Sequence, residues 1–290
     1  IISCLIFIVG CGPTDTGIIE EVLDIEEVYF TEWDKMDLYY ADFYESDYST
    51  LASVNQGLKN IGKAKGATLK IDESATQILN LAAERIDTLE GNEKDWVEQI
   101  DQCYTIRLER TSTLLEVVDN YETYLLFLQE DFNSLTLLED FGLKYNLFVQ
   151  EMDDEEAGKI LIDMSAQLGL IQDSISQKQS IIDIPSLEKQ KQSLEKLKDA
   201  FGLLSKAMAD KSKEAEYVEQ AYNKIVESDS LNIKSQSEFA EQTTQWFIDN
   251  IEDPDRLSYE QVVESNTYCN KASEIYDLIS KYGRDKIIVV

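Results

Sequence analysis

The chain of 290 residues contains no histidine. Histidine is the usual general base beside a serine or cysteine nucleophile, and it is the commonest metal ligand near neutral pH. Its absence removes the usual base of those two kinds of hydrolase and the imidazole ligand of metal centres, whereas carboxylate chemistry remains open. The sequence also lacks a glycine-rich phosphate loop, a Cys-x-x-Cys pair and a Gly-x-Ser-x-Gly turn. We therefore expect a protein that is not an enzyme and that holds no cofactor and no metal.

Proline and glycine are scarce, with only 3 Pro and 12 Gly in the chain. An all-β sandwich needs a turn about every 8 to 12 residues, and turns depend heavily on these two residues. Hydrophobic residues make up 43% and charged residues 29% of the sequence, which is ordinary for a folded protein. The composition therefore favours an all-α fold with long helices.

Positive charge is also scarce, because 26 Lys and Arg face 57 Asp and Glu, which gives a net charge of -31. Affinity for nucleic acid comes largely from Lys and Arg that replace the counterions of the phosphate backbone. A chain of this charge repels that backbone. We therefore expect no nucleic-acid partner.

Cysteine occurs only four times, and one of the four, Cys11, follows an uncharged and mostly apolar stretch, residues 1–10. This stretch is too short for a membrane-spanning helix, which needs about 20 residues. Ile8-Val9-Gly10-Cys11 resembles a prokaryotic lipobox, in which an aliphatic residue and two further residues, the last of them small, precede a cysteine. The resemblance covers these four positions and the apolar run before them.

The resemblance implies that residues 1–10 are a signal peptide, whose start we expect to be missing, and that Cys11 receives lipid and becomes the mature N-terminus. Residues 11–17 are small and polar, as in a short tether. Residues 18–290 then form the helical body. Such a protein is lipid-anchored at the cell membrane or outer envelope, outside the cytoplasm. The alternative is a buried strand or helix end that contains a free thiol at Cys11.

The helical body contains two cysteines, Cys103 and Cys269, and both lie on apolar helix stripes. Outside the cytoplasm they can form a disulfide, which would close a long loop and restrict the unfolded chain. The alternative is a pair of buried free thiols that pack as small hydrophobic side chains. Spacing in the sequence does not decide between the two, because a disulfide requires proximity in space.

Apolar residues recur at steps of three and four through the body, which is typical of amphipathic helices. We expect an elongated bundle of about six to seven long antiparallel helices, with a loop at residues 62–70. Arg107 and Arg110 interrupt the apolar stripe of the third helix. The expected helices cover residues 18–61, 74–90, 93–132, 136–183, 186–227, 235–251 and 258–283.

The first helix is rich in aromatic and acidic residues, with eight aromatics between residues 29 and 48. Aromatic faces and carboxylates together can bind sugars or cationic groups. Tyr39 and Tyr44 are the rings that we expect to be partly exposed, and they are our candidates for ligand contact. The alternative is that the rings of this helix pack in the core.

Two acidic runs, residues 153–156 and 252–255, could attract Ca²⁺. Neither has the spacing of a calcium-binding loop, with its central glycine and terminal glutamate. Acidic residues are also favoured at helix starts by the helix dipole. We interpret both runs as helix starts.

The sequence as a whole predicts a non-catalytic, lipid-anchored helical protein outside the cytoplasm. Its role would be that of a binding module, or of a spacer or scaffold, in the cell envelope. The expected partners are the membrane, through the N-terminal lipid, and an envelope protein or polysaccharide. The alternative is a solute-binding or sensory helical lipoprotein with a ligand pocket between its helices.

Overall fold

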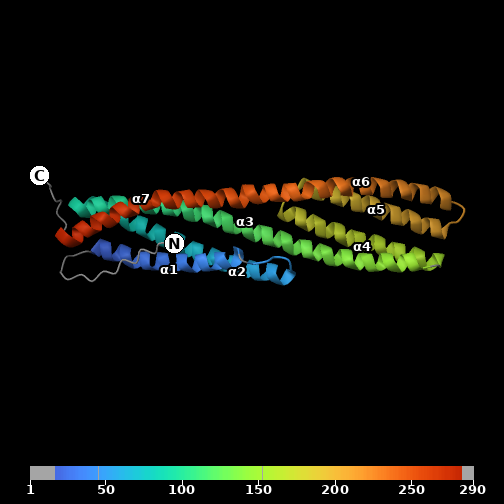
Figure 1. Cartoon of the computed structure of the whole chain (residues 1–290), viewed down its shortest axis with the longest axis horizontal. Helices are drawn as coiled ribbons and strands as arrows, with labels where there is room; N and C mark the ends of the chain where they lie inside the picture. Colours follow the sequence, from blue (N-terminus) through green and yellow to red (C-terminus); the bar gives the residue numbers. More distant parts are fainter. Residues whose placement is uncertain (1–16, 45, 152, 283–290) are drawn as a thin grey trace. The chain divides into compact units, whose positions relative to one another are not determined.

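A computed structural model describes residues 17–44, 46–151 and 153–282 (Figure 1). Every regular element in these ranges is helical, so the prediction of an all-α helical bundle is confirmed. Cys11 and the rest of the lipobox lie outside the described residues. The elements are α1 (Gly17–Tyr44), α2 (Leu51–Arg85), a 3₁₀ turn (Ile86–Thr88), α3 (Gly91–Gln150), α4 (Asp154–Ile181), α5 (Pro185–Ala209), α6 (Glu214–Phe247), a π-helical turn (Ile248–Glu252) and α7 (Asp253–Tyr282).

The chain divides into two compact units. The described part of the first unit comprises residues 17–44, 61–119 and 253–282, and so contains α1, most of α2, the N-terminal half of α3, and α7. The second unit comprises residues 46–60 and 120–252 without Met152, and so contains the start of α2, the C-terminal half of α3, and α4 to α6.

The core of the first unit is built from side chains at heptad spacing. On α1, Val22, Tyr29 and Met36 recur every seven residues, and all three are buried. This spacing is the one that lets neighbouring helices interlock side chains along a continuous seam. The remaining helices of the unit supply the opposing residues, which are Ala67, Ile71, Ala75, Ile78, Ala82, Trp96, Val97, Ile100, Cys103, Tyr104, Leu114, Ala272 and Ile279.

The core of the second unit is centred on α4, which contributes Leu161, Met164, Leu168, Ile171 and Ile175. Stacked aromatic pairs join its helices. Between α3 and α6 these are Phe127 with Phe239 and Tyr124 with Trp246, and between α3 and α5 the pair is Phe141 with Phe201, with ring centroids 6.0–6.3 Å apart. Such pairs add about 0.5 to 1.5 kcal/mol each beyond their buried area.

Within the second unit, α5 packs against α4 and α6, and its contact with α6 is lined by small residues. The Ser193 and Ser228 hydroxyls are 2.9 Å apart, and Ser193 Oγ also donates to the Ser228 carbonyl. Because the helices are antiparallel, one heptad away Ala200 comes opposite Ala221, and both are fully buried. We call this contact the small-residue seam.

One predicted helix boundary and one interpreted helix start are confirmed, and both have local causes. Pro185 begins α5 directly after Ile184, as expected from the poor fit of a pre-proline residue to a helix. Asp153 caps α4, because its carboxylate accepts hydrogen bonds from the backbone N–H groups of Glu155 and Glu156. The acidic run 153–156 is therefore a helix start, as interpreted. The predicted helix 136–183 is wrong in running through this point, because α3 ends at Gln150 and α4 begins at Asp154.

The predicted loop at residues 62–70 is wrong, because α2 runs through it as one helix. Each glycine inside a helix costs about 1 kcal/mol relative to alanine. Ile61, Ala64 and Ile71 are nevertheless fully buried, and burying side chains of this kind contributes more than the glycines cost.

The predicted first helix, 18–61, is interrupted, because α1 ends at Tyr44 and α2 begins at Leu51. Thr50 and Ser53 explain the new start. The Ser53 N–H donates to Thr50 Oγ1 at 3.1 Å, and the Thr50 N–H donates to Ser53 Oγ at 3.2 Å. These reciprocal bonds satisfy donors that a helix N-terminus leaves free.

Three further predicted breaks are wrong. The helix α3 continues past Thr136, whose hydroxyl donates to the Phe132 carbonyl inside the helix instead of capping a new one. The helix α6 continues through residues 227–236, and α7 has already begun before Ser258. A break that was not predicted falls at residues 210–213, where Asp210 accepts hydrogen bonds from the backbone and hydroxyl of Ser212.

Candidate functional site

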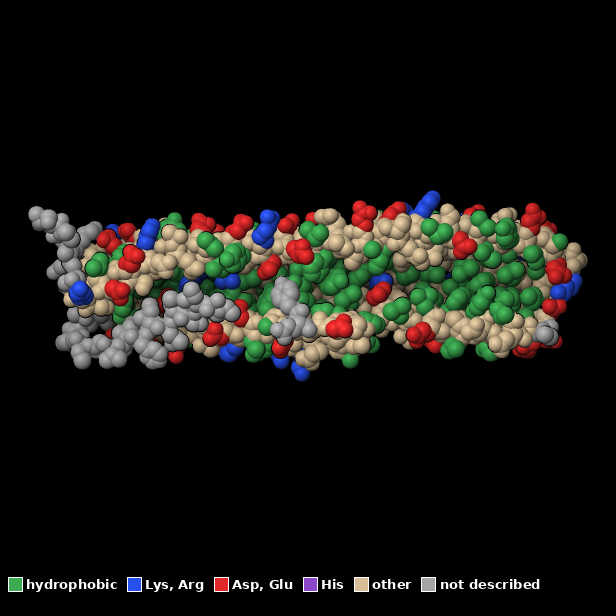
Figure 2. Space-filling view, in the orientation of Figure 1, with side chains coloured by type: hydrophobic (Ala, Val, Ile, Leu, Met, Phe, Trp, Pro, Cys, Tyr) green, Lys and Arg blue, Asp and Glu red, His purple; other side chains and the backbone are tan. Residues whose placement is uncertain are grey.

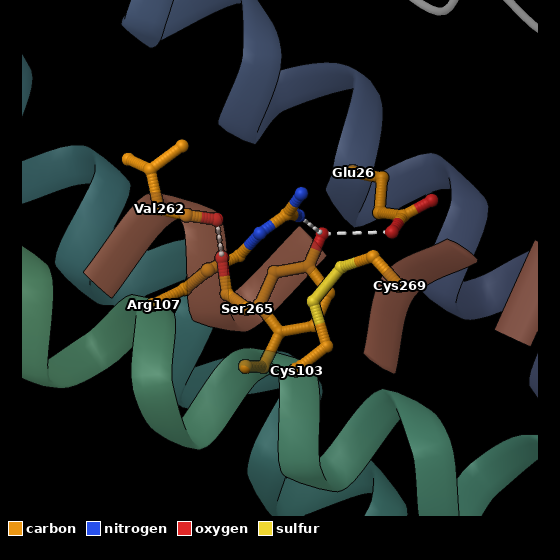
Figure 3. The surroundings of a disulfide bond; sticks show 7 residues. Glu26, Cys103, Arg107, Val262, Ser265 and Cys269 are labelled. Atoms are coloured by element: carbon orange, nitrogen blue, oxygen red, sulfur yellow. Dashed lines mark hydrogen bonds between the residues drawn. A yellow bond between two sulfur atoms is a disulfide. The ribbon is translucent and has the colours of Figure 1, made fainter. Parts of the chain in front are cut away.

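A disulfide joins Cys103 of α3 to Cys269 of α7 in the first unit (Figure 3). The Cα atoms of the two residues are 5.4 Å apart, which is within the usual range for a disulfide. Cys103 is fully buried in the core of this unit, and Cys269 packs against the same core. Of the two alternatives for these cysteines, the structure therefore contains the bonded pair.

A charged hydrogen-bond chain runs beside this disulfide and links α3 to α1 (Figure 3). Arg107 Nη1 donates to the Tyr104 hydroxyl at 2.9 Å, and that hydroxyl donates to Glu26 Oε1 at 2.7 Å. The Arg107 guanidinium also lies 4.9 to 5.4 Å from the ring centroids of Tyr104, Tyr29 and Phe30. Ring faces and a carboxylate thus compensate a positive charge that has little contact with water.

Burial dominates the electrostatics of this chain of residues. It raises the pKa of Glu26, and the Tyr104 hydrogen bond and the Arg107 charge oppose the rise only in part. Burial also raises the pKa of Tyr104 well above its ordinary value, so the phenol stays protonated and remains a donor to Glu26.

A second arginine, Arg110, lies one helical turn further along α3. Its guanidinium is 3.8 Å from the centroid of the Trp33 ring, and its Nε donates to the Ser258 hydroxyl of α7 at 3.2 Å. Burial lowers the pKa of Arg110 to about 10. The burial of Asp37 and of Asp255 raises the pKa of each carboxyl, and the nearby Arg110 charge opposes the rise.

These two arginines hold α1, α3 and α7 together inside the first unit. The sequence shows them as interruptions of an apolar stripe, but their aromatic and acidic partners lie on other helices and could not be identified from spacing. The surface of this unit has a groove between α1 and α2, and Arg107, Tyr104 and Glu26 do not line it. We therefore interpret these charged and aromatic residues as a structural cluster that stabilises the contacts between the helices.

The groove lies between α1 and α2 and has a volume of about 490 Å³. Its charged lining consists of three carboxylates and one lysine, Lys70, whose ammonium is 3.5 Å from Glu32 Oε1. The hydrogen bond from Lys35 is the main reason that the pKa of Glu32 is lowered. The lining residues are Asp24, Ile25, Val28, Glu32, Lys70, Glu73, Ser74 and Gln77.

Tyr39, one of the two tyrosines predicted to contact a ligand, is not among the described residues that line this groove. Tyr39 is half-buried, and the Lys63 ammonium lies 5.2 Å from the centroid of its ring. A cation from the chain itself thus already lies over one face of this ring. Tyr44 is the last residue of α1, and its side chain lies outside what the structure describes.

The second unit contains a buried lysine, Lys178 of α4. Its ammonium forms an ion pair with Asp131 of α3. It also lies 5.2 Å from the ring centroids of both Phe127 and Phe239. A lysine that is only 4% exposed therefore joins three helices of this unit. Sequence analysis missed it, because a lysine on a predicted helix is ordinarily a surface residue.

The fold and the contacts so far define an all-α helical bundle protein whose buried charges fasten helices together. Comparisons with protein-family models, with curated proteins and with solved structures found no match to the chain. None of the described helices is both long enough and apolar enough to cross a membrane.

Proposed function

We propose that the protein is a lipid-anchored helical protein outside the cytoplasm, where it acts as a binding module or spacer of the cell envelope. The observation that carries the proposal is the disulfide between Cys103 and Cys269. Disulfides persist in oxidising compartments and are rare where thiols are kept reduced. A body with a disulfide behind a lipobox-like Cys11 fits a protein held on the outer side of a membrane.

The packing of the bundle supports a role in binding or spacing. Both units bury apolar side chains in continuous cores. The buried charged groups described above are used in contacts between helices. A protein of this kind acts through the outer faces of its helices, on which an envelope protein or a polysaccharide can dock.

The anchor is tested by expressing the protein with a complete signal peptide and determining the intact mass of the membrane-extracted chain. We expect a mature chain that begins at Cys11 and carries lipid. The Cys11→Ser variant should leave the membrane fraction, whereas the matched Cys4→Ser variant should stay in it. Recovery of a soluble, unmodified chain that retains residues 1–10 would contradict the proposal.

The groove between α1 and α2 supports a second candidate, a solute-binding protein. Its volume of about 490 Å³ is within the range of small-molecule sites, and its excess of carboxylates favours a cationic ligand. Isothermal titration with spermidine tests this candidate. Binding that is weakened by Glu73→Gln but not by the exposed Glu219→Gln of α6 would support it. Absence of binding at about 1 mM, the weak end of specific affinities, would count against it.

A further inference from the structure

The C-terminal part of α3, residues 135–149, carries exposed apolar side chains in addition to those on its buried side, beside the exposed polar residues Thr136, Glu139, Asp140 and Asn146. Leu137, Phe141 and Phe148 pack against the core of the second unit. The exposed side chains are Leu135 (48% exposed), Leu138 (45%), Leu143 (64%), Tyr145 (50%), Leu147 (60%) and Val149 (63%). Exposed apolar side chains that gather on one face of a helix mark a candidate interaction site. Figure 2 shows apolar side chains gathered over the part of the molecule formed by α3 to α6.

The exposed residues include a stripe with the spacing of a coiled-coil seam. Leu135, Leu138, Gly142, Tyr145 and Val149 follow one another at steps of three, four, three and four. The stripe contains no charged residue, although the chain carries a net charge of -31. It therefore offers a surface on which two such acidic molecules can meet without placing acid against acid.

The stripe is also nearly symmetric about its central residue, Gly142. Leu135 and Val149 lie seven residues to either side of it, and Leu138 and Tyr145 lie four and three residues away. Such a pattern is self-complementary under a two-fold axis, which is the symmetry of most homodimers. A Cβ atom added at Gly142 would meet nothing within 4 Å, so the surface there is open.

We propose that this stripe is a homodimer interface, in which α3 of one copy lies antiparallel to α3 of a second copy with Gly142 at the two-fold axis. The lack of a side chain at Gly142 lets the two backbones approach closely. Leu135 then faces Val149 of the second copy, and Leu138 faces Tyr145. Glu139, beside the stripe, comes opposite the amide of Asn146, which can donate a hydrogen bond to it. The inference does not depend on the lipid anchor.

Sedimentation equilibrium of the full chain carrying Cys4→Ser and Cys11→Ser tests the dimer. We expect a dimer at about 100 µM, where even a weak specific interface is populated. Leu138→Glu should weaken the dimer by about tenfold or more, because the acid enters the interface twice. Val226→Glu on α6 is the matched control, since Val226 is 50% exposed and the charge change is the same. It should leave the dimer intact.

A disulfide cross-link between two copies tests the position of the proposed two-fold axis. In the same background, mild oxidation should join two copies of Gly142→Cys, whereas the exposed Ser230→Cys of α6 should remain monomeric. A monomer at about 100 µM, or a dimer unaffected by Leu138→Glu, would overturn the proposal. In the first case a lipid surface or another protein would have to cover the stripe.

Discussion

Cys103 and Cys269 have Cα atoms 5.4 Å apart, although 166 positions separate them in the sequence. The segment between them includes every residue of the second unit from 120 to 252. The disulfide therefore joins two helices of the first unit that come before and after this long segment in the sequence. In the unfolded state the same bond would restrict a loop of that length.

Replacing both cysteines, as Cys103→Ser with Cys269→Ser, should lower the free energy of unfolding by about 2 to 5 kcal/mol, because the unfolded chain gains the freedom that the cross-link removes. Urea unfolding followed by circular dichroism measures this loss. Helical content in the absence of urea should remain close to that of the parent. Dithiothreitol should destabilise the parent and leave the double variant unchanged, and equal stability of the oxidised parent and the variant would refute the prediction.

Glu26 should make the stability of the protein depend on pH in a defined direction. Burial raises its pKa from the ordinary 4.5, so between that value and the raised one the folded chain holds a proton that the unfolded chain has lost. The contribution of Glu26 to the free energy of unfolding is therefore greatest at low pH and falls as the pH rises through the raised pKa.

The measurement is the difference in unfolding free energy between the parent and Glu26→Gln at several pH values. The difference should become less favourable to the parent from about pH 4 to pH 7. Glu27→Gln, which changes an exposed neighbour on the same helix, is the control for the loss of one carboxylate. A flat profile for Glu26→Gln would show that burial does not control this carboxyl.

The ion pair between Lys178 and Asp131 should respond differently to the loss of each partner. Asp131→Asn leaves a buried ammonium without its counter-charge and should destabilise the protein by about 1 to 3 kcal/mol. Lys178→Met keeps an unbranched side chain between Phe127 and Phe239 and should cost less than about 1 kcal/mol. Urea unfolding of both variants provides the comparison, and equal losses would contradict this account of the pair.

The small-residue seam predicts intolerance to bulk at Ala200. Ala200→Leu places three additional carbons where α5 and α6 are in close contact and should destabilise the protein by about 1 to 3 kcal/mol. Ala240→Leu, at an exposed position of α6, should change stability by less than about 0.5 kcal/mol. Thermal unfolding distinguishes the two. Equal stability of the Ala200→Leu and Ala240→Leu variants would show that the seam is not closely packed.

Helix formation could be predicted from the sequence, and so could some of the helix starts that have a local cause. Pro185 and the Asp153 cap are of this kind, because their effect depends on neighbouring backbone groups. The continuation of α2 through Gly62 and Gly66 was not predictable locally, because it depends on residues such as Ile61 and Ile71 being buried by other helices.

The candidate site was less predictable than the fold. Cys103 and Cys269 were recognised as a potential pair, but only their proximity in space decides the matter. Arg107 was visible only as an interruption in an apolar stripe. Its partners Glu26 and Tyr29 lie about 80 positions away on another helix, so no local pattern could reveal that the guanidinium is enclosed.

The turn of residues 210–213 connects α5 and α6, and the small-residue seam between these helices has a practical consequence for it. Ser193 and Ser228 fix how the two helices are aligned, so the number of residues in the turn does not have to. Exposed loop tips of this kind tolerate inserted sequence. A short labelling peptide placed after Lys211 should therefore leave the hairpin folded, which gives the molecule a built-in attachment point for a reporter.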